Sequence, residues 1–196
     1  MATPARISFK LYQGSTFAEV LRWESPIKGY KPITAITKSA PVVITSANHG
    51  IPTGWRILLK NIVGMTELNS ADSYNLVTES TSNTITINAI NSLDYKAYVS
   101  GGIIEYNVPV DLTGYTGRMQ LRSDIDSSVV IHELTTANSG VVFDATFKTI
   151  NLNIPAITTS GFDFTTAVYD LELISSGGQV TQFCGGSITL VREVTR

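Results

Sequence analysis

Alternation of polar and apolar residues at period two is the feature that most constrains this chain. Arg118–Arg122 alternates strictly, and in Ile150–Ile154 asparagines separate three apolar residues. A period of two sends one set of side chains into a core and leaves the other in water, as in a β-strand. No segment keeps a helical period for more than about two turns. The sequence therefore predicts an all-β fold.

Turn residues separate the expected strands. Asp111–Gly114 combines Asp and Thr, which bond locally to the backbone, with a Gly that tolerates positive φ, and Ser176–Gly178 predicts a hairpin turn. Near the N-terminus, the alternating runs 7–11 and 17–23 predict an opening hairpin. Prolines and a glycine then break the pattern over residues 25–32, which makes this segment a candidate domain boundary.

Composition excludes several classes of function. The 14 Lys and Arg residues nearly balance 16 Asp and Glu residues, giving a net charge of −2, and they form no basic cluster. We therefore expect neither nucleic acid nor an anionic membrane as a partner. No run approaches the ~18 apolar residues of a membrane helix, and the N-terminus lacks the apolar core of a secretion signal. We expect a soluble protein that is not secreted by a signal.

Isolated histidines and paired carboxylates are the first candidates for chemistry. A metal site needs several converging ligands, whereas His49 and His132 each stand alone in the sequence; we expect His49 to cap backbone groups in its Gly- and Pro-rich turn. Asp170 and Glu172 lie two apart and so share one face of a strand. Such a pair can serve a glycosidase, but the solvent face of a half-buried strand is the favoured interpretation.

The remaining candidates also have structural interpretations. Asp124–Ser128 lacks the spacing and Gly of a Ca²⁺ loop and is expected to be a solvated turn. The only cysteine, Cys184, is expected in the core, and Gly101-Gly102 lacks the helix and Lys of a phosphate loop, so we interpret it as a hinge. We predict no catalytic, cofactor-binding or metal-binding residues, no cofactor, and no enzymatic activity.

Four aromatic residues form the last candidate site: Trp23, Trp55, Tyr95 and Tyr98. Aromatic side chains on strands usually belong to the core, yet they are also enriched at interfaces. For Tyr95 and Tyr98 we consider the alternative that both side chains are exposed and belong to a carbohydrate-contacting surface.

Six phrases occur in a recognisable order: Gln13–Phe17, Arg22-Trp23, Asp111–Tyr115, Arg118–Arg122, Tyr169–Leu173 and Glu193–Arg196. Together they resemble a structural domain of tailed bacteriophages, the β-sandwich at the N-terminus of siphophage upper baseplate proteins and in many small tail proteins. In that family the Arg-Trp strand is followed closely by a Pro-x-Asp-Leu-Thr-Gly turn. Here a long segment separates the two.

The intervening segment has its own phrases: Ile33-Thr34, Pro41–Val43, Asn48–Gly54, Gly64–Asn69 and Tyr98–Gly102. It resembles a domain of phage proteins that is named for its similarity to the first catalytic-cysteine half-domain of ubiquitin-activating enzymes (FCCH-like). No cysteine lies in this segment, which excludes ubiquitin-type thioester chemistry. Its short expected strands fit a small β-barrel or roll.

These observations predict a discontinuous β-sandwich, residues 1–30 with 103–196, carrying an inserted small β domain, residues 31–102. The resemblance implies a bacteriophage virion structural protein, assembled in the host cytoplasm. It would be a tail, baseplate or tail-fibre adaptor that joins copies of itself, as a homo-oligomer, and other virion proteins. The alternatives are a host-surface glycan-binding module of the tail and a head decoration protein.

Overall fold

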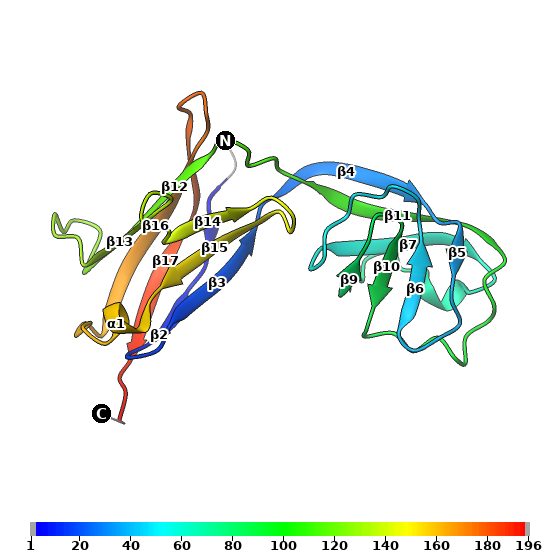
Figure 1. Ribbon diagram of the computed structural model, residues 1–196, viewed down its shortest axis with the longest axis horizontal. Helices are drawn as coiled ribbons and strands as arrows, with labels where there is room; N and C mark the ends of the chain where they lie inside the picture. Colours follow the sequence, from blue (N-terminus) through cyan, green and yellow to red (C-terminus); the bar gives the residue numbers. More distant parts are fainter. Residues whose placement is uncertain (1–2, 195–196) are drawn as a thin grey trace. The chain divides into compact units, whose positions relative to one another are not determined.

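The computed structural model describes residues 3–194, and they are almost entirely strand and turn (Figure 1). The predicted all-β fold class is confirmed. The helical elements described are single turns, the 3-10 helix η1 (Thr66–Leu68) and the α-helix α1 (Ala156–Thr159). Contacts divide the chain into two compact units. The sandwich unit contains the residues up to Arg22 and those from Asp111 onward, and the insert unit is Trp23–Val110.

Two sheets form the sandwich unit (Figure 1). The larger sheet contains, in spatial order, β1 (Ala5–Arg6), β17 (Val180–Val191), β16 (Thr166–Ile174), β12 (Thr116–Arg122) and β13 (His132–Thr135), with β2 (Phe9–Tyr12) also paired to β17. The smaller sheet contains β14 (Val141–Asp144), β15 (Thr149–Ile154) and β3 (Phe17–Arg22). The resemblance phrase Glu193–Arg196 extends beyond the described residues.

The predicted alternation determines which side chains the sandwich buries. In β12, Met119 and Leu121 are fully buried, while Arg118 on the same strand faces outward. The turn before β12 forms as predicted, because the Asp111 carboxylate accepts hydrogen bonds from the N–H and the hydroxyl of Thr113 at 3.1 and 2.7 Å. The hairpin predicted at Ser176–Gly178 also forms and joins the antiparallel strands β16 and β17.

The predicted opening hairpin is wrong. β2 runs parallel to β17 in the larger sheet, whereas β3 pairs with β15 in the smaller one. The rings of Phe9 on β2 and Phe17 on β3 instead meet edge to face, with centroids 5.6 Å apart. Both strands carry an apolar stripe, and the stripes face each other across the core instead of lying side by side in one sheet.

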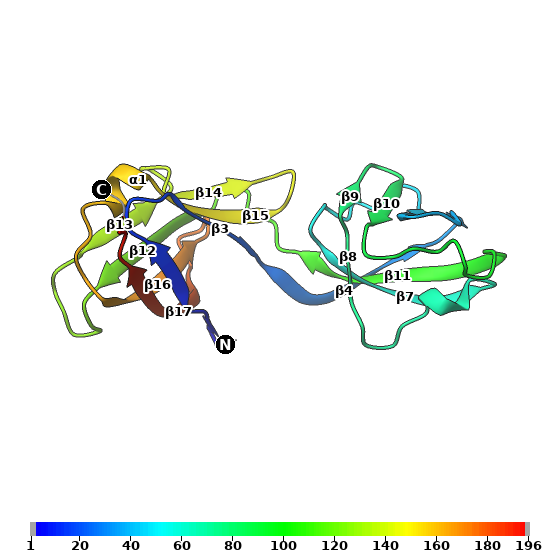
Figure 2. The same ribbon diagram turned by 90° about the horizontal axis from the view of Figure 1, so that it is seen from below.

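The insert unit also has two sheets, which enclose one core (Figure 2). One sheet contains β4 (Glu24–Pro32), β11 (Ser100–Pro109), β7 (Arg56–Val63) and β8 (Asn75–Leu76). The other contains β5 (Ala35–Ile36), β6 (Val42–Thr45), β10 (Thr84–Ile87) and β9 (Glu79–Ser80). Neither sheet closes on itself, so an open roll describes the unit and a closed barrel does not.

The segment expected to break the pattern, residues 25–32, is in fact the strand β4. Its prolines are tolerated because β4 is the edge strand of its sheet and pairs only with β11. The chain enters the insert unit on β4 and leaves it on the antiparallel β11, and where the two strands meet the sandwich unit's chain segments the Val110 N–H donates to the Trp23 carbonyl at 3.0 Å. The chain's entry and exit thus lie side by side, as an inserted domain requires.

Two features predicted from the sequence, the domain limits and a hinge, fall inside the strands β4 and β11. The predicted domain limits, 30/31 and 102/103, lie within β4 and β11, whereas the contacts divide the chain at 22/23 and 110/111. Gly101-Gly102, interpreted as a hinge, belongs to β11, where Gly101 pairs with Ile62 of β7. Their positive φ angles, 71° and 99°, explain the glycines, and a Cβ on Gly102 would lie 2.8 Å from Ile62.

Candidate interaction surfaces

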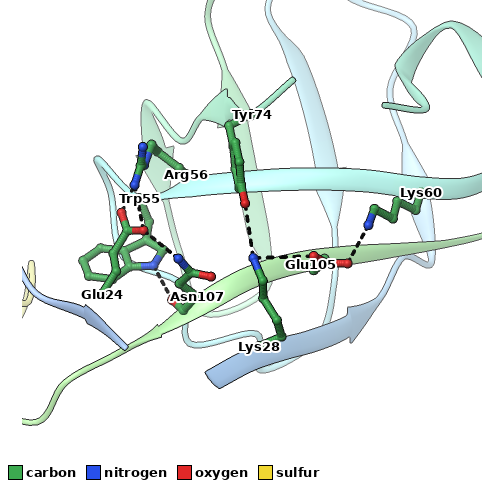
Figure 3. Close-up of polar contacts among 8 residues, drawn as sticks. All are labelled: Glu24, Lys28, Trp55, Arg56, Lys60, Tyr74, Glu105 and Asn107. Atoms are coloured by element: carbon green, nitrogen blue, oxygen red, sulfur yellow. Dashed lines mark hydrogen bonds and ion pairs between the residues drawn. The ribbon is translucent and has the colours of Figure 1, made fainter. Parts of the chain in front are cut away.

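One face of the insert unit carries a network of partnered polar side chains, which we call the ladder face (Figure 3). It is the side of the β4–β11–β7–β8 sheet that points away from the core. Its members come from all four strands or their flanks: Glu24 and Lys28 on β4, Glu105 and Asn107 on β11, Arg56 and Lys60 on β7, and Tyr74 just before β8.

Ion pairs cross the ladder face between neighbouring strands. Arg56 binds both carboxylate oxygens of Glu24, with Nε–Oε1 at 3.1 Å and Nη2–Oε2 at 2.8 Å. Glu105 accepts from Lys60 Nζ at 2.7 Å and lies 3.6 Å from Lys28 Nζ. The hydrogen bond with Lys60 lowers the pKa of Glu105 and raises that of Lys60. Glu105 and Lys60 are therefore both charged at neutral pH.

The cations of this network are more exposed than the carboxylates. The side chains of Arg56, Lys60 and Lys28 are 54%, 36% and 33% exposed, whereas those of Glu24 and Glu105 are 13% and 12% exposed. Three cations therefore lie outermost over two recessed carboxylates. The ladder face presents positive charge to a partner, although its pairs nearly neutralise it.

Tyr74 lies at the centre of this surface. Its hydroxyl is 3.2 Å from Lys28 Nζ, and its ring lies 5.6 Å from Lys28 Nζ and 5.5 Å from Arg56 Cζ. The ring is still 44% exposed. Leu58, opposite Glu105 on this same face, is only 4% exposed. An exposed tyrosine beside arginine over an apolar base is typical of protein interfaces.

A second candidate surface is a groove of about 920 Å³ on the outer face of the larger sandwich sheet. The N-terminal residues from Thr3 to Arg6 line it together with side chains of β12, β16 and β17. Arg118 donates to Glu172 at 2.6 Å, and Gln182 donates to Asp170 at 2.8 Å. Both carboxylates considered for glycosidase chemistry thus have partners on neighbouring strands, the arrangement expected on a solvent face.

His49 has a structural role in its turn. The side chain is 1% exposed, Nδ1 accepts from the Ile51 N–H at 3.0 Å, and Nε2 lies 3.3 Å from the Thr84 carbonyl. The predicted capping of backbone groups is confirmed, and the Nε2 proton is the one that donates. Burial lowers the pKa of His49, so the ring is neutral at pH 7.

Each of the other candidate residues from the sequence has structural contacts of its own. His132 packs its ring against Phe162 at 5.6 Å. Cys184 is fully buried beside Tyr169, as predicted, and burial raises the pKa of its thiol to about 11, so it is an inert thiol at neutral pH. Asp124 accepts from the Asp126 N–H at 3.0 Å and forms the expected turn. Among residues 3–194, no group of three His, Cys, Asp or Glu side chains gathers into a metal site.

The four aromatic candidates do not assemble into a platform. Trp55 is fully buried and donates its indole N–H to the Asn107 carbonyl at 2.7 Å. Tyr95 and Tyr98 pack against the insert core, and the Tyr98 hydroxyl donates to the Gly101 carbonyl at 2.9 Å. Of these three, Trp55 is buried, and Tyr95 and Tyr98 are half-buried. The half-buried Trp23 lies at the start of the insert unit.

Comparison with known families found no family model that matches the sequence, and no curated protein matches it. In the described part of the chain, no helix has the length and apolar character needed to cross a bilayer.

The ladder face was missed by sequence reasoning. A predicted strand over Trp55–Leu59 puts Arg56 and Leu58 on one face, which is a usable local signal. The partners Glu24 and Glu105 lie far away in the sequence, on strands whose register no local pattern specifies. The segment 25–32, which carries Lys28 and directly follows Glu24, was interpreted as a boundary, which removed it from consideration.

Proposed function

We propose that this protein is a structural component of a tailed-bacteriophage virion, an adaptor of the tail, baseplate or tail fibre that joins neighbouring proteins through its β-sheet faces. Its role is mechanical. The sheets hold the side chains of their outer faces in fixed positions, and these side chains become buried when a partner binds. The adaptor has no catalytic step. Its copies assemble with themselves and with other virion proteins after synthesis in the host cytoplasm.

The observation that carries this proposal is the ladder face. Its ion pairs are already formed within one molecule, so a partner need not supply each charge. Four exposed apolar or aromatic residues accompany these ion pairs: Tyr30, Tyr74, Leu76 and Ile103. In the strand register Tyr30 lies opposite Glu105, Leu76 opposite Arg56, and Ile103 opposite Lys60. Rigid, prepaired side chains lose little conformational freedom on binding, which favours a fixed joint between proteins.

The inserted architecture supports the same proposal. A sandwich of two packed sheets carries a second β unit on two adjacent strands, β4 and β11. The sequence phrases that resemble the phage tail sandwich lie on the sandwich unit or at its border, and those that resemble the FCCH-like phage domain lie in the insert unit. The phage assignment rests on these phrases, and the adaptor role rests on the exposed sheet faces.

Particle composition tests the proposal. Purified virions of the phage that encodes this chain should contain it at a fixed number of copies, detected by quantitative mass spectrometry. Gold-labelled antibody should place it on the tail or its tip. Labelling on the capsid would move it to head decoration. Absence from purified particles would refute the proposal.

A further inference from the structure

The sandwich unit displays an acidic loop with an exposed apolar tip between β12 and β13. Ile125 is 84% exposed and stands between Asp124 and Asp126. The Asp124 carboxylate accepts from the Asp126 N–H and from the Ser123 hydroxyl, both at 3.0 Å. These local bonds fix the turn, so Ile125 is held outward with a carboxylate on each side. An apolar side chain between two acidic residues is suited to a cationic, partly apolar receptor.

The ladder face has the complementary chemistry. Its outermost charged groups are the cations of Arg56, Lys60 and Lys28, its carboxylates are recessed, and Tyr74 and Leu76 offer apolar area beside them. The net charges of the two units agree with this pairing of an acidic loop and a cationic face. Of the 14 basic and 16 acidic residues, the sandwich unit carries 8 and 10, a net charge of −2. The insert unit carries six of each and is neutral.

We infer that the ladder face of one copy of this protein binds the Asp124–Asp126 loop of a second copy. Ile125 packs on Tyr74 and Leu76, and the two carboxylates lie against the exposed cations. This inference rests on the proposed function, because it names the partner of the surface assigned there. The contact is heterologous, since loop and receptor are different surfaces, so it propagates from copy to copy into a ring or a filament.

The expected contact is small. Four strands spaced about 4.8 Å apart, with an average length of about seven residues, give a face of roughly 450 Å², against the ~800 Å² per partner of a standard interface. A single contact is therefore expected to be weak, and a particle that aligns many copies would strengthen it through high effective concentration. Weak association in solution must be sought at high protein concentration.

Two exposed side chains allow a test with matched controls. Tyr74→Ala removes the centre of the receptor and Ile125→Ser removes the tip of the loop. Tyr12→Ala and Ile157→Ser are the controls, because Tyr12 and Ile157 are exposed to a similar degree, 55% and 83%, and lie outside both surfaces. Sedimentation velocity up to about 1 mM should show the wild type growing beyond a dimer. Each test variant should weaken association at least about tenfold, as expected on losing an interface hot spot, while the controls stay near the wild type.

Mixing the two test variants gives the sharpest result. Ile125→Ser keeps an intact ladder face and Tyr74→Ala keeps an intact loop, so an equimolar mixture can form one contact and then stop. The mixture should give dimers and nothing larger, although each variant alone stays monomeric. A monomeric wild type at 1 mM, unchanged association in the variants, or a mixture that stays monomeric would each overturn the inference. If Tyr74→Ala fails to fold, Lys60→Glu takes its place.

The failures of the inference and of the proposed function are distinguishable. A protein found in particles that does not self-associate through these surfaces retains the adaptor role and loses the loop contact. A protein that self-associates as described but is absent from particles retains the contact and loses the virion role.

Discussion

The two units of this protein hold their cores together in different ways. The sandwich unit relies on long strand pairs: β16 and β17 pair over the whole length of β16. The insert unit has one group of long strands, β4, β11 and β7, but its other strands are only two to four residues long, and buried polar side chains hold the loops between them. Ser92, fully buried, accepts from the Ser39 N–H at 2.9 Å and donates toward the carbonyls of Ser39 and Thr37 at 2.9 and 3.0 Å.

This difference shows that side-chain hydrogen bonds replace backbone hydrogen bonds between strands where the strands are short. Each loop must satisfy its buried N–H and C=O groups through side chains. Asn69 does so by bonding both the N–H and the carbonyl of Ile62, and His49 bonds Ile51 and Thr84. The insert unit should therefore be sensitive to single polar substitutions, and the sandwich unit to the loss of apolar volume.

Removal of a core side chain should have the largest effect and should stay within one unit. Trp55→Ala deletes a fully buried indole and its hydrogen bond to Asn107, and is expected to cost about 3–5 kcal/mol. Hydrogen exchange followed by mass spectrometry should show lost protection in peptides from residues 24–110. The matched variant Leu171→Ala should expose the sandwich peptides instead. Loss of protection in both units from either variant would contradict the separation of the cores.

Removal of one buried hydroxyl should come next. Ser92→Ala leaves the Ser39 N–H and the Thr37 carbonyl without the hydroxyl, although the Ser39 carbonyl keeps the backbone N–H of residue 92, and should cost about 1–3 kcal/mol. Both tryptophans lie in the insert unit, so the urea dependence of tryptophan fluorescence follows this unit alone. The control Ser82→Ala, at an exposed serine of the same unit, should leave the urea midpoint unchanged. Equal midpoints for both variants would show that strand pairing alone holds the insert.

Acid should weaken the insert unit through His49. Burial lowers the folded pKa below the ordinary value of 6.5, so the unfolded chain takes up the proton first as the pH falls. The stabilisation is complete above about pH 6.5 and declines as the pH drops from there toward the folded pKa. Urea midpoints by tryptophan fluorescence should therefore be lower at pH 5 than at pH 7.5. In His49→Asn, whose amide oxygen can still accept from Ile51, that pH dependence should shrink; an unchanged slope would exclude His49 as its source.

The smallest effect is expected on the solvent face of the sandwich. Arg118→Ala removes the ion pair with Glu172, but the Arg118 side chain is 53% exposed, and exposed pairs contribute about 0–1 kcal/mol. Thermal unfolding should shift by a few degrees at most. A loss of stability as large as that expected for Ser92→Ala would mean that polar side chains in the groove stabilise the sandwich unit, as buried polar side chains stabilise the insert unit.

Local patterns predicted much of the sandwich and little of the ladder face. Met119 and Leu121 are buried because alternation assigns them to one side of a strand, and Asp111 and Gly114 make the turn that their chemistry favours. Gly101-Gly102 misled the prediction, because glycine signals an unusual φ whether it lies in a hinge or in a paired strand. The polar network around Glu24 combines residues from three strands, and no sequence pattern links them.

The sequence by itself determined the secondary structure class, the buried face of the main strands and the turn before β12. These depend on neighbours within a few residues, where side-chain period and backbone preference act directly. Only the tertiary structure decided that β2 and β3 join different sheets, that β4 continues as an edge strand, and that the Lys28 and Lys60 side chains meet at Glu105. Strand partners are chosen by the packing of the whole core, which a period-two pattern leaves open.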